Sequence, residues 1–131
     1  MLFRSAAPGG TESILLVEDE DAVRELVRTV LEARGYTVVE ARNGREGLGL
    51  CEARKGGIDL LVTDVVMPEL GGRELAEMAI KIRPGLKVLF MSGHTQDVIL
   101  KEGVQQGAAF LHKPFTPMKL AQKVRDTLDG K

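Results

Sequence analysis

The stretch Asp59–Pro68, DLLVTDVVMP, is an almost unbroken apolar run in which one carboxylate, Asp64, stands four residues before the proline. An ionised side chain that is buried without a partner is strongly disfavoured. Asp64 is therefore expected either where a strand emerges into solvent or beside compensating cations. The apolar residues before it predict a strand that is covered on both faces, as in a parallel sheet.

Outward from this run, short apolar segments alternate with segments of helical periodicity. The predicted strands are Ser13–Val17, Tyr36–Ala41, Ile58–Asp64, Leu86–Ser92 and Ala108–Lys113. The predicted helices are residues 23–34, residues 43–54, the segment between Pro68 and Pro84, residues 95–106 and residues 116–128. Parallel strands joined by helices need right-handed crossovers, so the fold class is α/β, with a doubly wound five-stranded parallel sheet and five helices.

Two of these helices have a clear start, and one has a weak anchor. Asn43 and Thr116 are predicted N-caps, because their side chains can accept a hydrogen bond from an amide of the first helical turn. Pro117 fits the first helical position. The helix from Thr95 to Gln106 carries little apolar surface and contains Gly103, so we expect it to be weakly packed.

The composition excludes several classes of protein. The chain has 131 residues and a formal charge of −1, with acids and bases interspersed, which favours neither nucleic acid nor a membrane surface as a partner. Its apolar runs are too short to cross a bilayer. Cys51 is the only cysteine, so no intrachain disulfide can form and a cytoplasmic location is expected. Residues 1–12 are predicted to be a linker or an expression tail, and residues 13–131 one domain.

Charged and polar side chains stand where the predicted strands end. They are Glu18, Asp19, Glu20, Asp64, Ser92, His94 and Lys113. Ligands of a doubly wound sheet bind beyond the carboxyl ends of its strands. Clustered carboxylates repel one another, and a hard divalent ion such as Mg²⁺ removes this conflict while leaving positions for phosphate oxygens. Because a carboxylate needs no base to become a nucleophile, the pattern predicts phosphoryl transfer to Asp64.

Each of these residues alone is more often structural. Acids at a helix start complement the helix dipole, and a single Asp64 or Lys113 would usually be a strand-end or surface charge. His94 and His112 lack the spacing of a metal motif. Gly71-Gly72 lacks the phosphate fingerprint of a nucleotide fold. The joint spacing of acids, hydroxyl and lysine reverses these odds.

Four blocks at the strand ends carry a family resemblance: LLVEDE (15–20), VTDVVMPELGG (62–72), FMSGH (90–94) and FLHKPF (110–115). Together they resemble the receiver domain of two-component response regulators, over residues 13–128. MPELGGREL and KPFTPMKLAQKVRD are similar to the receiver at the C-terminus of hybrid sensor histidine kinases. The resemblance implies a flavodoxin-like sheet with strand order 2-1-3-4-5.

The resemblance also implies the chemistry of the acidic residues. Asp64 would be the phosphoacceptor and a metal ligand. Asp19 would bind Mg²⁺ directly, Glu18 directly or through water, and Val66 through its carbonyl. Glu18 stands where aspartate is frequent in the family, which keeps the carboxylate that the site requires.

Three further residues have implied roles in response to phosphorylation. Lys113 would contact the phosphoryl group, and the Lys113–Pro114 bond would be cis. Ser92 is similar to the switch hydroxyl that moves to hold a phosphoryl oxygen. Phe110 is similar to the aromatic residue whose rotamer follows that hydroxyl, although tyrosine is frequent at its position, which leaves the choice of partner open.

The function implied is a phosphoacceptor switch that is not an enzyme beyond assisting its own phosphorylation and dephosphorylation. The partner would be a histidine kinase or a histidine phosphotransfer protein, which would donate from phosphohistidine. Occupancy would reset the face formed by the fourth helix, the fifth strand and the fifth helix, and a homodimer through this face is one expected arrangement. Two alternatives stay open: a phosphorylation-independent interaction module, and a flavin- or magnesium-dependent phosphotransferase on a similar sheet.

Overall fold

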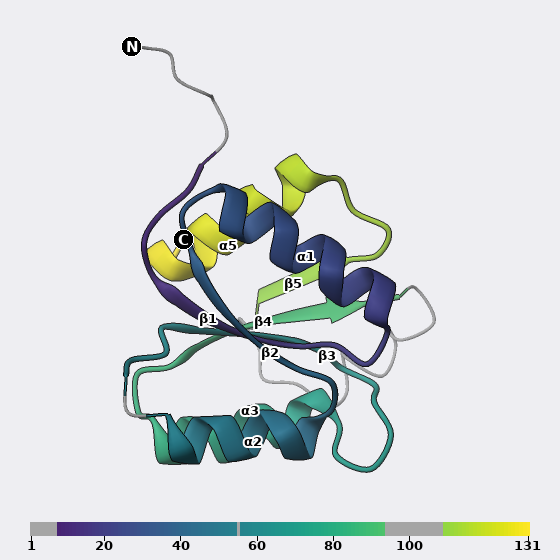
Figure 1. Ribbon diagram of the computed structural model, residues 1–131, viewed down its shortest axis with the longest axis vertical. Helices are drawn as coiled ribbons and strands as arrows, with labels where there is room; N and C mark the ends of the chain where they lie inside the picture. The colour runs from purple at the N-terminus through teal and green to yellow at the C-terminus, as the bar shows by residue number, and fades with distance from the viewer. Residues whose placement is uncertain (1–7, 55, 94–108) are drawn as a thin grey trace.

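The computed structural model describes residues 8–54, 56–93 and 109–131 (Figure 1). Its elements are β1 (Ser13–Val17), α1 (Asp21–Ala33), β2 (Thr37–Ala41), α2 (Gly44–Ala53), β3 (Leu60–Asp64), α3 (Gly72–Ile82), β4 (Lys87–Ser92), β5 (Ala109–His112) and α5 (Pro117–Asp129). The helix predicted from Thr95 to Gln106 lies outside the described residues.

The five strands form one parallel sheet in the order β2-β1-β3-β4-β5, which confirms the predicted fold class and strand order. Helices α1 and α5 cover one face of the sheet, and α2 and α3 cover the other (Figure 1). The central strand β3 pairs with β1 on one side and β4 on the other. Every residue of β3 is buried, as its continuous apolar sequence predicted.

Successive side chains of β1 and β3 pack alternately into two separate hydrophobic cores. Leu15 and Leu61 pack with the α2 and α3 layer, whereas Leu16 and Val62 pack with the α1 and α5 layer. Side chains that alternate along a strand point to opposite faces, so a strand with helices on both sides needs apolar residues at every position. The rigid centre of the sheet thereby fixes where β1 and β3 end, which is where the candidate site lies.

The predicted helix starts are confirmed. The Asn43 side chain accepts a hydrogen bond of 2.8 Å from the Glu46 amide, and the Thr116 hydroxyl accepts one of 3.1 Å from the Lys119 amide. Each cap satisfies a donor that the first helical turn leaves without an intrahelical partner. At its other end α5 stops at Gly130, whose φ of 77° is a left-handed conformation that glycine adopts without strain.

The segment before β1 packs against the domain. The Gly10 amide donates to the Arg34 carbonyl at 3.1 Å, and Glu12 forms a two-point ion pair with Arg125 of α5, with a shorter N–O distance of 2.7 Å. Arg125 also donates to the Gly9 carbonyl at 3.2 Å. Strand β1 begins at Ser13 as predicted, and the packed part of the chain extends from there back to Gly9.

Candidate functional site

Three strand ends bring oppositely charged side chains together. Glu18 directly follows β1, Asp64 ends β3, and Lys113 directly follows β5. The Lys113 ammonium nitrogen lies 2.7 Å from Asp64 Oδ1 and 3.0 Å from Glu18 Oε1. The same nitrogen lies 4.0 Å from Glu20 Oε1. The convergence of strand ends that the parallel sheet predicted is therefore confirmed for Glu18, Asp64 and Lys113.

Glu18 is completely buried and held from several directions. Its amide donates to the Ala41 carbonyl at 3.1 Å, which continues the pairing of β1 with β2. Its carboxylate accepts a hydrogen bond of 2.9 Å from the Glu20 amide, in addition to the contact with Lys113. Glu18 thus lies inside the site as a fixed carboxylate, whereas the neighbouring Asp19 is exposed.

Asp64 is 3% exposed, and its backbone is tightly constrained. Its carbonyl accepts a hydrogen bond of 3.0 Å from the Thr63 hydroxyl. The Gly72 amide at the start of α3 donates to the Val65 carbonyl at 2.8 Å. A Cβ atom on Gly72 would overlap the Asp64 carbonyl oxygen and lie 3.0 Å from Val65 Cα. The absence of a side chain at Gly72 is what lets α3 approach the end of β3.

Burial and like charge dominate the electrostatics of the site. Burial and the neighbouring Glu18 carboxylate raise the pKa of Asp64 to about 8, and Lys113 offsets only part of this shift. Burial also acts to raise the pKa of Glu18, but the Asp64 carboxyl, the Glu20 amide and Lys113 together lower it below its usual range. The pKa values of the two carboxyl groups are therefore shifted in opposite directions, upward for Asp64 and downward for Glu18.

The site has a donor set suited to a divalent cation. Glu18, Asp19 and Asp64 each place a carboxylate oxygen within 4.8 Å of the other two. Oxygen ligands of this kind are what Mg²⁺ and Ca²⁺ bind in proteins. The raised pKa of Asp64 agrees with this fit, because a cation among these oxygens would offset the burial and the Glu18 charge that raise it. The acidic cluster can hold a metal ion.

The other predicted residues that the structure describes lie on or near the same edge, and His94 lies outside the described residues. Ser92 is buried at the end of β4 and pairs across the sheet with His112, with its hydroxyl 3.5 Å from His112 Nδ1. Phe110 lies half-buried in β5 and stacks on Phe90, with ring centroids 5.6 Å apart. Val66 follows β3 with an exposed side chain. The Lys113–Pro114 bond is cis, as the resemblance implied.

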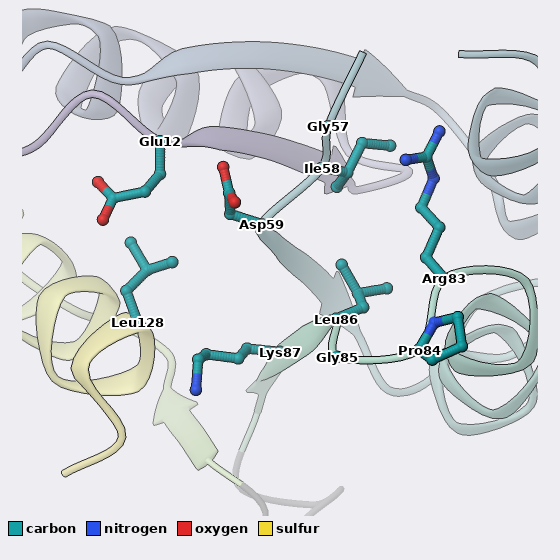
Figure 2. A pocket seen from close by; sticks show the side chains of 10 residues that line it. All are labelled: Glu12, Gly57, Ile58, Asp59, Arg83, Pro84, Gly85, Leu86, Lys87 and Leu128. Atoms are coloured by element: carbon teal, nitrogen blue, oxygen red, sulfur yellow. The ribbon is translucent and has the colours of Figure 1, made fainter. Parts of the chain in front are cut away.

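A pocket of about 500 Å³ lies at the opposite, amino edge of the sheet (Figure 2). Apolar side chains such as Ile58, Leu86 and Leu128 line it, together with charged ones. Its carboxylates are engaged in contacts within the fold, since Glu12 pairs with Arg125 and Asp59 accepts a hydrogen bond of 2.9 Å from the Ser13 amide. Both carboxylates therefore have partners within the fold at this edge.

The acidic cluster predicts that Asp64→Asn stabilises the metal-free chain. Because the pKa of Asp64 is raised above its unfolded value of about 4, its contribution to stability is full below about pH 4 and is lost as the pH rises through about 8. We expect the variant to gain roughly 1–3 kcal/mol of unfolding free energy at about pH 8.5 and much less at about pH 5. Urea denaturation with a chelator measures this difference, and a less stable variant at the higher pH would contradict it.

The comparison with protein families decides the identity of the fold and site. The family model described as response regulator receiver domain matches residues 14–125. The chain belongs to the response regulator receiver domain family. It is thus a receiver domain of two-component signalling, and its cluster of Glu18, Asp19 and Asp64 is typical of a phosphoacceptor site.

The relatives of this receiver domain include a sensor kinase and a small receiver protein. It is 41% identical over 121 residues to the sensor kinase CckA of Brucella abortus, and the match covers 92% of this chain but 13% of that kinase. It is 34% identical to the response regulator receiver protein CpdR of Brucella abortus, with 88% of this chain and 95% of CpdR covered. The crystal structure of the receiver domain from the hybrid histidine kinase CckA matches with a TM-score of 0.75 and 39% identity, over 88% of this chain and 98% of that one.

Sequence reasoning did not assign a role to two residues that shape the receiver site. The sequence indicated only that Gly72 belongs to a pair of glycines that permits a tight turn. In the structure, its lack of a side chain allows the start of α3 to lie against the Asp64 backbone. Arg24, in the first part of α1, donates a hydrogen bond of 2.7 Å to the Glu18 carbonyl. No signal in the sequence separates Arg24 from Arg28, the other arginine of α1, because the contact depends on how the helix leaves β1.

Proposed function

We propose that this receiver domain accepts a phosphoryl group from phosphohistidine on Asp64, with Mg²⁺ bound by Glu18, Asp19, Asp64 and the Val66 carbonyl. The observation that carries the proposal is the pairing of a buried Asp64 with both Lys113 and a second carboxylate. A fold-stabilising ion pair needs one acid and one base. Two further acids with oxygens within 4.8 Å of each other and of Asp64 are unfavourable for stability alone and useful for binding a cation.

The proposed transfer forms one bond to phosphorus and breaks one. An oxygen of the ionised Asp64 carboxylate attacks phosphorus and forms a P–O bond while the P–N bond to the imidazole breaks. The imidazole nitrogen leaves with the bonding electron pair and ends as neutral histidine, with a proton taken up from solvent. The reaction consumes no other reagent, and the product is an aspartyl phosphate with a free donor histidine.

The residues of this chain would divide the work of stabilising the charge. Mg²⁺, when bound, would supply the Lewis-acid charge that neutralises the phosphoryl oxygens. The Lys113 ammonium, which contacts Asp64 at 2.7 Å, is placed to pair with the transferred group once that group extends from Asp64. Ser92, buried at the neighbouring strand end, would donate its hydroxyl to a phosphoryl oxygen.

We propose that the output is a shift between two conformations. Ser92 and Phe110 would change position together, because β4 and β5 pair side by side and hold the Phe90–Phe110 stack between them. The face that responds would include β5, α5 and the segment between β4 and β5, which lies outside the described residues. The proposed donor is a histidine kinase or a histidine phosphotransfer protein, and the proposed setting is cytoplasmic. No helix among the described residues is long and apolar enough to cross a membrane.

Binding of Mg²⁺ is expected to tighten as the pH rises. A carboxylate must lose its proton to ligate a cation, and the pKa of Asp64 is raised to about 8. The affinity should therefore rise by up to about tenfold per pH unit between about pH 6 and pH 8, and then level off. Calorimetric titration of the wild type and Asp64→Asn measures this. A wild-type affinity independent of pH over this range would contradict the raised pKa of Asp64.

A small phosphoramidate tests the proposed donor chemistry, because its P–N bond is of the kind that phosphohistidine carries. With Mg²⁺ we expect one slower band on a phosphate-binding gel, and no such band with a chelator or in Asp64→Asn. A band that persists in Asp64→Asn would place the acceptor elsewhere. A folded wild type that binds Mg²⁺ yet gives no band would support the phosphorylation-independent interaction module instead.

A further inference from the structure

Arg24 links the start of α1 to the end of β1. Its Nη1 donates a hydrogen bond of 2.7 Å to the backbone carbonyl of Glu18, six residues earlier. Its Nη2 lies 2.6 Å from Asp21 Oδ1, and its Nε lies 3.5 Å from Glu40 Oε1 at the end of β2. The side chain is only 12% exposed. One guanidinium group therefore joins β1, α1 and β2 around the turn that carries Glu18 and Asp19.

Other hydrogen bonds also hold Glu18 in this turn. The Glu18 amide is bonded to the Ala41 carbonyl, and the Glu18 carboxylate accepts from the Glu20 amide. The Glu18 carbonyl is the group that Arg24 holds. Because the same residue supplies a buried carboxylate to the acidic cluster, a rotation of its backbone would move that carboxylate relative to Asp64.

We propose that Arg24 is a positioning residue for the divalent cation site, acting through the backbone of Glu18. This inference rests on the proposed function, since it concerns the same metal site. Groups that hold metal ligands in place change metal affinity without touching the ion. Arg24 fits this description because its donor reaches the main chain of Glu18, while its ion pairs are with Asp21 and Glu40, which are not members of the acidic cluster.

The sign of the effect separates positioning from simple charge. A cation near an acidic site weakens the binding of a second cation, so removing the Arg24 charge alone would tighten Mg²⁺ binding. Removing a group that holds the metal ligands in position would instead weaken Mg²⁺ binding. The two explanations therefore predict changes in opposite directions for one substitution.

Arg28 provides a matched control on the same helix. It lies one turn further along α1, and its Nε is 3.1 Å from Oε2 of the same Glu40. Arg28 also forms an ion pair of 3.3 Å with Glu32, and its side chain is 35% exposed. Arg28→Gln thus removes a similar charge and a similar contact with β2 but leaves the hydrogen bond to Glu18 in place.

The test is calorimetric titration of Mg²⁺ into the wild type, Arg24→Gln, Arg24→Lys and Arg28→Gln, with amide hydrogen exchange of residues 18–21 as a second readout. We expect Arg24→Gln to bind about tenfold more weakly and to exchange faster in this turn. Arg24→Lys keeps the charge but not the planar fork, so a loss of about threefold is expected. Arg28→Gln should bind as tightly as the wild type or slightly more tightly.

The outcomes distinguish this inference from the proposed function. Unchanged or tighter binding in Arg24→Gln overturns the positioning role while the metal site stands. If Arg24→Gln does not fold, Arg24→Lys decides, and wild-type affinity with unchanged exchange overturns the inference. A folded wild type that binds no Mg²⁺ at the acidic cluster overturns both.

Discussion

Replacing Lys113 with methionine is expected to slow phosphoryl uptake from acetyl phosphate by about 100- to 1,000-fold. The Lys113 ammonium lies 2.7 Å from Asp64 and 3.0 Å from Glu18, so it is the side chain best placed to compensate charge on a group attached to Asp64. Methionine fills a similar volume but carries no charge or donor. The rate measured by single-turnover sampling and intact-mass analysis at saturating Mg²⁺ tests this expectation.

Lys119 supplies the control for this substitution. It lies exposed in the first turn of α5, close in sequence to Lys113, and Lys119→Met removes the same charge away from the acidic cluster. We expect this variant to take up phosphate at nearly the wild-type rate. A rate for folded Lys113→Met within about threefold of wild type would remove Lys113 from the chemistry.

The second large effect concerns stability. Gly72→Ala is expected to lower the free energy of unfolding by about 3 kcal/mol, because the new methyl group would overlap the Asp64 carbonyl oxygen and press on the Val65 backbone. The atoms it meets are main-chain atoms of the strand that carries the phosphoacceptor, so they cannot move aside without moving the site. Urea denaturation measures the loss, and phosphoryl uptake should fall with it.

Gly49→Ala is the matched substitution in a helix without this constraint. Apart from the adjacent residues and backbone of α2 itself, no described atom lies within 4 Å of a Cβ atom at Gly49. Alanine also has the higher helix propensity, so we expect a gain of roughly 0.5–1 kcal/mol. If both alanine variants changed stability in the same direction, the close approach of α3 to β3 would not be the reason for glycine at position 72.

Much of the fold could be predicted because local signals and global topology agree. The apolar run that ends at Asp64 is fully buried in β3, and the caps at Asn43 and Thr116 accept the expected amides. The strand ends converge because a parallel sheet places all carboxyl ends on one edge. This rule predicted that Glu18 and Lys113, which are 95 residues apart in sequence, lie close together, and the structure shows them in contact.

Other features could not be read from the sequence, because they depend on approach distances that local patterns do not encode. The two-point ion pair of Glu12 with Arg125 joins residues that are 113 apart in sequence. It holds the segment just before β1 against α5. A Cβ atom at position 72 would overlap the Asp64 carbonyl oxygen because the start of α3 lies very close to the end of β3. The contact of Arg24 with the Glu18 carbonyl depends on the angle at which α1 leaves β1.

The measurement that tests the central claim most directly is the intact mass of the chain after treatment with acetyl phosphate, with and without Mg²⁺. Wild type and Asp64→Asn should be compared under both conditions after confirming that each is folded. The account predicts a single phosphoryl adduct on the wild type that requires Mg²⁺ and is lost in Asp64→Asn. A folded, Mg²⁺-bound wild type that gains no adduct, or an adduct that survives in Asp64→Asn, would contradict it.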